Sequence, residues 1–175
     1  MIKALPHVAN MAAYALADIT APKGKRLISL SQNESLRGPS PAVIEAVSHA
    51  AGSAHLYPDP NWSELRQALG ALHRVDPDCI LCGSGSLDLI GAIARAYLGP
   101  GRAALAPAHA YPFFRSATQL TAARFDVAAE NNTVADVGAL LSCVQEDTRV
   151  VFLANPGNPT GTRLPRSDIL DLRDA

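Results

Sequence analysis

Short apolar segments alternate with amphipathic ones along most of the chain, and this alternation constrains the fold more than any other feature. We expect strands near 78–81, 103–106, 124–127 and 149–153, with helices at about 87–97, at about 113–122 and from Thr133 onward. Alternating strands and helices form βαβ units, which set the strands parallel in one sheet with right-handed crossovers. The sequence therefore predicts an α/β fold.

Several helix boundaries carry recognisable capping residues. Ser40 followed by Pro41 predicts a helix that ends at Gly52, because serine caps and proline fits the first helical position. Asn61, with Glu64 three residues later, predicts the start of a second helix. We also expect an N-terminal helix around residues 11–17 and a capped helix from Ser167 to the last residue.

Composition excludes several classes of protein. The 175 residues are 48% hydrophobic with a net charge of −1, which argues against a nucleic-acid-binding protein, because such a protein needs a basic patch. No apolar run reaches membrane-spanning length, and three cysteines fit a reducing cytoplasm better than a disulfide framework. Cys79 and Cys82 have the spacing of half a zinc or redox site, but no second ligand pair accompanies them.

The segment Asn155-Pro156-Gly157-Asn158-Pro159 follows the last predicted strand directly. Two Asn-Pro steps around a glycine cannot continue a helix or a strand, so they predict a stiff loop with its asparagine amides facing outward. In open α/β sheets the carboxyl ends of the strands are where ligands bind. The loop is therefore a candidate ligand site rather than an ordinary turn.

Two other loops follow the same logic. Gly83-Ser84-Gly85-Ser86 lies before a helix whose N-terminal N–H groups would hold a phosphate, although Ser86 acting simply as a helix cap is equally consistent. Tyr111 follows the second strand and either stacks on a flat ring or belongs to the core. We expect His109 to be a structural hydrogen-bonding residue, because no carboxylate is near it in sequence. A flat, phosphorylated cofactor fits all three loops.

With these motifs the sequence resembles the fold-type-I, pyridoxal-phosphate-dependent class I/II aminotransferases, most closely their histidinol-phosphate aminotransferase-like branch. The resemblance runs from about Leu27 to the end of the chain and includes the three loops described above. Further matching segments are Leu30-Ser31-Gln32-Asn33-Glu34, Gly38-Pro39-Ser40-Pro41, Tyr57-Pro58-Asp59, His109-Ala110-Tyr111 and the continuation of the asparagine loop through Thr160 and Gly161. Leu87-Asp88 departs from the Asp-Glu that this branch often has.

The resemblance implies roles for particular residues. The cofactor is pyridoxal 5′-phosphate, with its phosphate on Ser84, Gly85 and Ser86. Tyr111 would stack on the pyridine ring, and Asn158 would hydrogen-bond the phenolic oxygen. Tyr57 would reach the partner's cofactor phosphate across a dimer. Asn33 and Glu34 would lie near the substrate.

The resemblance also implies residues that this sequence does not supply. In such enzymes a lysine that bonds to the cofactor and an aspartate that pairs with the ring nitrogen come well after the asparagine loop. Only 14 residues follow Gly161 here, and the lysines are Lys3, Lys23 and Lys25. We therefore expect an N-terminal part of such an enzyme, inactive alone and lacking the middle strands of its sheet.

The expected architecture is an incomplete part of the mainly parallel, three-layer α/β/α large domain of these enzymes. Residues 1–60 would form an N-terminal arm and small-domain or dimer segment, and residues 61–175 a partial cofactor-binding domain. The implied activity is transamination between an amino acid or amino phosphate and a 2-oxo acid, in a cytoplasmic homodimer without nucleic-acid or membrane partners. The alternatives are a lyase of the same fold, similar to threonine-phosphate decarboxylases, and a non-catalytic phosphate-binding or dimerising module.

Overall fold

The computed structural model describes residues 2–11, 20–21, 23–26, 28, 30 and 33–175. It divides into two compact units, Ala15–Ile80 in the smaller and Met1–Tyr14 with Leu81–Ala175 in the larger. A short helix, α1 (Pro6–Ala9), lies near the N-terminus. Most of the helix expected around residues 11–17 falls outside the described residues. The predicted division at residue 60 stays a prediction.

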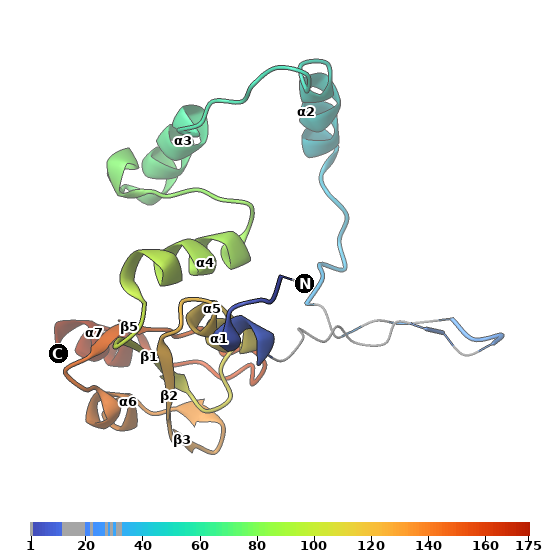
Figure 1. Cartoon of the computed structure of the whole chain (residues 1–175). Coiled ribbons are helices and arrows are strands. Elements are labelled where there is room, and N and C mark those ends of the chain that lie inside the picture. The colour runs from blue at the N-terminus through green and yellow to red at the C-terminus, as the bar shows by residue number, and fades with distance from the viewer. Residues whose placement is uncertain (1, 12–19, 22, 27, 29, 31–32) are drawn as a thin grey trace. The chain divides into compact units, whose positions relative to one another are not determined.

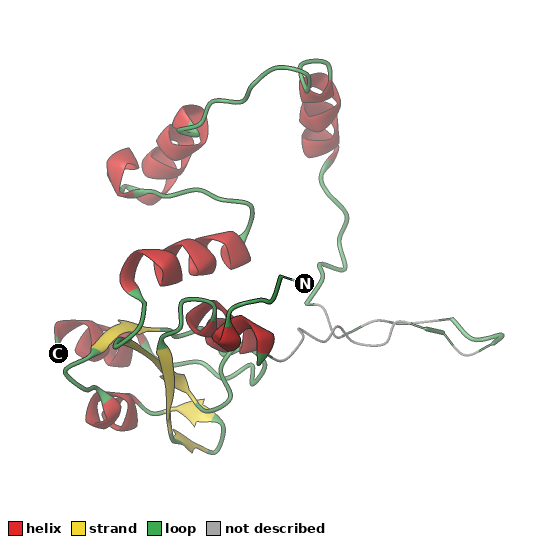
Figure 2. Cartoon of the chain, in the orientation of Figure 1, coloured by secondary structure: helices red, strands yellow, loops and turns green. Residues whose placement is uncertain are grey.

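The smaller unit contains helices α2 (Pro41–Ala51) and α3 (Ser63–His73) and the 3₁₀ helix η1 (Pro77–Cys79) (Figure 2). The start of α2 is as predicted, because the Ser40 hydroxyl accepts a hydrogen bond from the Val43 amide at 3.4 Å. The predicted cap at Asn61 is wrong. Asp59 satisfies the start of α3 instead, accepting from the Asn61 and Ser63 amides at 2.9 and 2.7 Å. These backbone hydrogen bonds lower the pKa of the Asp59 carboxyl.

The larger unit is built on a three-stranded parallel sheet in the order β2-β1-β5 (Figure 1). Its strands are β1 (Ala103–Pro107), β2 (Arg124–Ala128) and β5 (Thr148–Val151). The three later strands predicted from the sequence are therefore confirmed as parallel neighbours. The central strand β1 is buried along its whole length, which explains its apolar sequence.

Helices cover both faces of this sheet. Successive β1 side chains point to opposite sides, so both faces need a covering layer if all five residues are to be buried. Ala104 and Ala106 share one core with α4 (Ser86–Tyr97) and α5 (Pro112–Gln119). Leu105 faces the other way and packs with α6 (Val137–Cys143) and α7 (Arg166–Asp174). The predicted three-layer α/β/α arrangement is confirmed. No helix in the described part of the chain is long and apolar enough to cross a membrane.

Three sequence expectations about individual elements are wrong. The segment predicted as a strand at 78–81 forms η1 and an irregular stretch, because a strand needs a neighbour for its backbone groups and no described strand pairs with it. Thr133 does not open a helix but lies in the turn of a hairpin, and α6 begins after Asp136, whose carboxylate accepts from the Ala139 amide at 2.9 Å. Helix α7 begins at Arg166 without a side-chain cap.

Arg124 joins the amino ends of β2 and β5. Its guanidinium donates to Asp126 at 2.9 Å, to both Asp147 oxygens at 2.7 and 2.9 Å, and to Gln145 at 3.1 Å. The paired, charge-assisted geometry lowers the pKa of the Asp147 carboxyl through these hydrogen bonds and the arginine charge. The arginine thus connects the first residue of one edge strand to the loop before the other.

We expect Arg124→Met to lower the thermal unfolding midpoint at neutral pH. Because the pKa of Asp147 is lowered in the folded state, its contribution is present above its ordinary pKa of about 4 and is lost as pH falls below that value. The difference between wild type and variant, measured by circular dichroism, should therefore shrink in acid. Arg95→Met on the exposed side of α4 is the control, and a difference that persists unchanged near pH 2.5 would contradict this pairing.

Candidate active site

The glycine-serine loop forms an exposed turn at the start of α4. Gly85 has a φ of +84°, a conformation that favours glycine. The Ser84 amide donates to the Asp88 carboxylate at 3.1 Å, and the Gly85 amide donates to the Gly83 carbonyl at 2.8 Å. The N–H groups of Ser86, Leu87 and Asp88 in the first turn have no partner among the residues described. Together with the exposed Ser84 and Ser86 hydroxyls, they can hold an anion.

Asp88 is a site residue that the sequence reasoning missed. Its carboxylate is exposed but reaches back across the turn to accept from the Ser84 amide, so it shapes the loop. The signal was present, since an acidic side chain in the first turn of a helix often binds a backbone N–H just before that helix. The departure at Leu87-Asp88 from the branch pattern leaves this contact intact.

Tyr111 lies at the border between the core and the carboxyl edge of β1. Its ring is half-buried and meets Phe114 edge-on, with centroids 5.7 Å apart. Phe114 in turn stacks on Phe152, with centroids 4.7 Å apart and planes 9° from parallel. Phe114 and Phe152 are core residues, whereas Tyr111 keeps part of its ring accessible. The Phe114–Phe152 pair therefore packs against the buried side of the Tyr111 ring.

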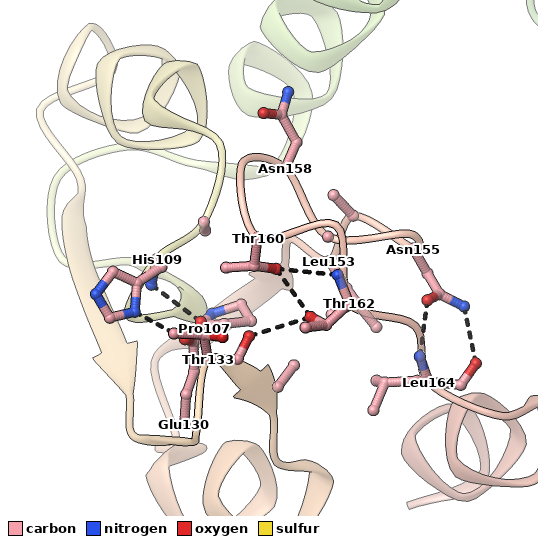
Figure 3. A pocket seen from close by; sticks show the side chains of 14 residues that line it. Pro107, His109, Glu130, Thr133, Leu153, Asn155, Asn158, Thr160, Thr162 and Leu164 are labelled. Atoms are coloured by element: carbon pink, nitrogen blue, oxygen red, sulfur yellow. Dashed lines mark hydrogen bonds and ion pairs between the residues drawn. The ribbon is translucent and has the colours of Figure 1, made fainter. Parts of the chain in front are cut away.

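The two asparagines of the Asn-Pro loop have different roles (Figure 3). Asn155 pairs with Leu164, donating to its carbonyl at 3.2 Å and accepting from its amide at 2.9 Å. The side chain of Asn158 has no hydrogen-bond partner among the described residues, and it points away from the neighbouring threonines. The expectation that both amides face outward is thus wrong for Asn155 and right for Asn158.

The loop around Asn158 is closed by short-range contacts. The Gly157 amide donates to the Thr162 carbonyl at 2.7 Å, and the Gly161 amide donates to the Gly157 carbonyl at 2.8 Å. A methyl group on Gly157 would collide with the Thr160 hydroxyl in its present position, so a larger residue would force that side chain to move. Both Asn-Pro peptide bonds are cis. Asn158 is therefore presented from a well-defined loop.

The three loops share one hydrophobic core. Ile90, one turn into α4, packs on the same cluster as Tyr111 and as Ala154, which precedes the Asn-Pro loop. His109 and Ala110 also line one small cavity together with Asn158. The structure thus brings the Tyr111 and Asn158 loops together and packs α4, which follows the glycine-serine loop, on their common core.

The remaining predicted site residues lie in the smaller unit. Tyr57 is fully exposed, and Asn33 and Glu34 are exposed as well. Their roles stay predictions. Cys79 and Cys82 are free thiols, and in the described part of the chain no cluster of three or more histidine, cysteine, aspartate or glutamate side chains is arranged to hold a metal.

Comparison with known proteins decides the family. The family model for aminotransferase class I and II matches residues 25–175. The chain belongs to this family. Curated relatives include the histidinol-phosphate aminotransferase of Rhodospirillum rubrum, 45% identical over 149 residues, which cover 85% of this chain and 40% of that protein. The corresponding enzyme of Rhodopseudomonas palustris is 38% identical over 96% of this chain and 46% of its own length.

Solved structures agree with the fold. Histidinol-phosphate aminotransferase from Sinorhizobium meliloti, in complex with pyridoxal-5′-phosphate, superimposes with a TM-score of 0.86 at 26% identity, covering 99% of this chain and 48% of that one. An aminotransferase from Escherichia coli gives a TM-score of 0.76 at 20% identity. The chain is therefore part of a fold-type-I aminotransferase architecture, and it spans about 40% of the length of the curated relatives it matches.

The contrast between the two asparagines gives a test by unfolding. We expect Asn155→Ala to lower the free energy of unfolding by about 1–3 kcal/mol, because it leaves the partly buried Leu164 amide and carbonyl without their partner. Asn158→Ala, which removes no contact between described residues, should change it by less than about 0.5 kcal/mol. Urea denaturation measures both, and equal losses would contradict the assignment of separate roles.

Proposed function

We propose that this chain supplies the cofactor-holding part of a pyridoxal-phosphate-dependent aminotransferase. The reaction would move an amino group from an amino acid or an amino phosphate similar to histidinol phosphate to a 2-oxo acid. Support comes from the family, from relatives named as histidinol-phosphate aminotransferases, and from the solved relative in complex with pyridoxal-5′-phosphate. The observation that carries the proposal is the unpaired Asn158 amide beside the loop of Tyr111.

The donor set of the structure fits a phosphate at the start of α4. Because the Ser84 and Gly85 amides are engaged within the loop, the phosphate would bind the first-turn N–H groups from Ser86 onward. The Ser84 and Ser86 hydroxyls would add two further donors, and Gly85 would allow the backbone to approach closely. The positive end of the helix dipole favours the same anion.

Tyr111 and Asn158 fit the ring of the cofactor. The half-buried Tyr111 ring, supported by Phe114 and Phe152, would stack on the pyridine and exclude water from one face. The Asn158 side-chain amide would donate to the phenolic oxygen and orient the ring. When bound, pyridoxal phosphate supplies an electron sink for the carbon that loses its proton. These residues of the chain bind and orient; they transfer no proton themselves.

Further parts of the proposal rest on the smaller unit and on the whole protein. Tyr57 would contact the cofactor phosphate of a partner subunit in a homodimer, and Asn33 and Glu34 would lie near the substrate. Residues 1–60 would form the arm and dimer segment, and residues 61–175 the cofactor-binding part. The enzyme would act in the cytoplasm. The balanced charge of the chain supports small-molecule substrates rather than nucleic acid.

Cofactor affinity tests the proposal directly. We expect the purified chain to bind pyridoxal phosphate in equilibrium dialysis, and Asn158→Ala to weaken binding about tenfold, or about 1.4 kcal/mol. Ser84→Ala combined with Ser86→Ala should weaken pyridoxal phosphate but leave pyridoxal, which lacks the phosphate, unaffected. Asn10→Ala in the exposed cap of α1 is the control. Equal affinity of all variants would contradict the assigned site.

Turnover gives a second test. The lysines are Lys3, Lys23 and Lys25, and the resemblance places the lysine that bonds to the cofactor after the Asn-Pro loop. With added pyridoxal phosphate and a 2-oxo acid as acceptor, we expect the 175-residue polypeptide to convert neither histidinol phosphate to its ketone nor aromatic or aliphatic amino acids to their 2-oxo acids. A coupled assay for the amino acid formed from the acceptor measures this. Measurable turnover would contradict the expectation that the reacting lysine lies after the Asn-Pro loop.

A further inference from the structure

A small hairpin that the proposed function does not use lies after the carboxyl end of β2. It consists of β3 (Glu130–Asn131) and β4 (Val134–Ala135), paired antiparallel. Asn132 and Thr133 form its turn with φ angles of 50° and 64°, the positive values that a tight hairpin of this kind requires. Its backbone geometry is therefore closely defined.

The first strand of the hairpin holds the Tyr111 loop. The Glu130 carboxylate accepts from the His109 backbone amide at 3.0 Å and contacts the His109 Nδ1 at 2.8 Å. The Glu130 side chain is only 5% exposed, whereas that of His109 is 62% exposed. A nearly buried carboxylate is costly unless hydrogen bonds compensate it, so both contacts are strongly favoured. His109 precedes Tyr111 by two residues.

The turn of the hairpin holds the Asn158 loop. The Thr133 carbonyl accepts from the Thr162 hydroxyl at 3.1 Å. The Thr162 hydroxyl also lies 2.8 Å from that of Thr160, and these two threonines close the loop over Gly157. Figure 3 shows this chain of contacts below Asn158, whose amide points the other way.

The space between the three segments is nearly filled. Residues of the hairpin, the Tyr111 loop and the Asn158 loop line one cavity of about 20 Å³. That volume suffices for one water molecule but not for a cofactor ring. The hairpin therefore packs directly against both loops, and each loop is held by its own hydrogen bonds to the hairpin.

We propose that the β3–β4 hairpin is a strut that fixes the Tyr111 and Asn158 loops relative to each other, with Glu130 and Thr162 as positioning residues. This inference rests on the proposed function, in which Tyr111 and Asn158 contact the cofactor ring. Glu130 acts on Tyr111 through His109, and Thr162 acts on Asn158 through the closed loop. Holding both loops before the ring arrives lowers the ordering cost of binding.

Double-mutant cycles on pyridoxal phosphate affinity test the strut. We expect Glu130→Ala to weaken binding about fivefold to tenfold in the wild-type chain but less than about twofold in the Tyr111→Ala chain, because its effect passes through Tyr111. We expect Thr162→Val to weaken binding by a similar factor in the wild-type chain and by less than about twofold in the Asn158→Ala chain. Glu130→Gln, which keeps the shape and an acceptor oxygen, is the milder variant should Glu130→Ala fail to fold. Glu146→Gln, on the exposed loop before β5, is the matched control.

The visible circular dichroism of bound pyridoxal phosphate provides an independent readout, since it reports ring orientation rather than stability. We expect this signal to fall in the Glu130 and Thr162 variants at saturating cofactor. Each protein is measured at the same number of degrees below its own thermal unfolding midpoint, so that differences in stability do not contribute. Equal losses of affinity in both backgrounds, or an unchanged signal, would overturn the strut. If the wild-type chain binds no pyridoxal phosphate, the proposed function fails. If the wild-type chain binds pyridoxal phosphate and Asn158→Ala weakens this binding, but the Glu130 variants do not, only the strut fails.

Discussion

The burial of β1 between two helical layers is the constraint on which the rest of the larger unit depends. All five of its residues are buried, and it hydrogen-bonds to both other strands of the sheet. Its alanines Ala104 and Ala106 leave room for α4 and α5 to approach closely, while Leu105 fills the opposite face. The Tyr111 loop follows this strand, the Asn-Pro loop follows the neighbouring β5, and the glycine-serine loop leads into α4, which shares its core. The position of the site therefore depends on that burial.

The site itself depends on a division of labour among polar groups. Some polar side chains hydrogen-bond to backbone groups or to neighbouring hydroxyls, namely Asn155, Asp88 and the threonines of the Asn-Pro loop. The Asn158 side-chain amide and the first-turn N–H groups of α4 have no hydrogen-bond partner among the described residues. A rigid framework with a few unpaired donors at the carboxyl edge of a sheet is the arrangement that binds an anionic, planar ligand with little reorganisation.

Much of the fold was predictable because its signals are local. The strand around Ala104 is apolar, and those around Phe125 and Val150 are short and contain aromatic or β-branched residues. Ser40-Pro41 specifies the start of a helix by capping and a fixed φ. The errors fell where a distant or absent neighbour decides the outcome. The segment at 78–81 has strand-like residues but no described strand beside it, and Asp59 rather than Asn61 reaches the open amides of α3.

The parallel α/β core and the three loops that carry Ser84, Tyr111 and Asn158 could be identified from the sequence, because they depend on periodicity and on residues with special backbone preferences. The family could be identified from the resemblance of its motifs. The three-dimensional packing determines that Asn155 rather than Asn158 pairs with Leu164, and that Glu130 contacts His109. Those two residues are separated by 21 positions and come together only after β1 and β2 pair. Hydrogen bonds between segments distant in sequence have no local pattern, so packing alone selects them.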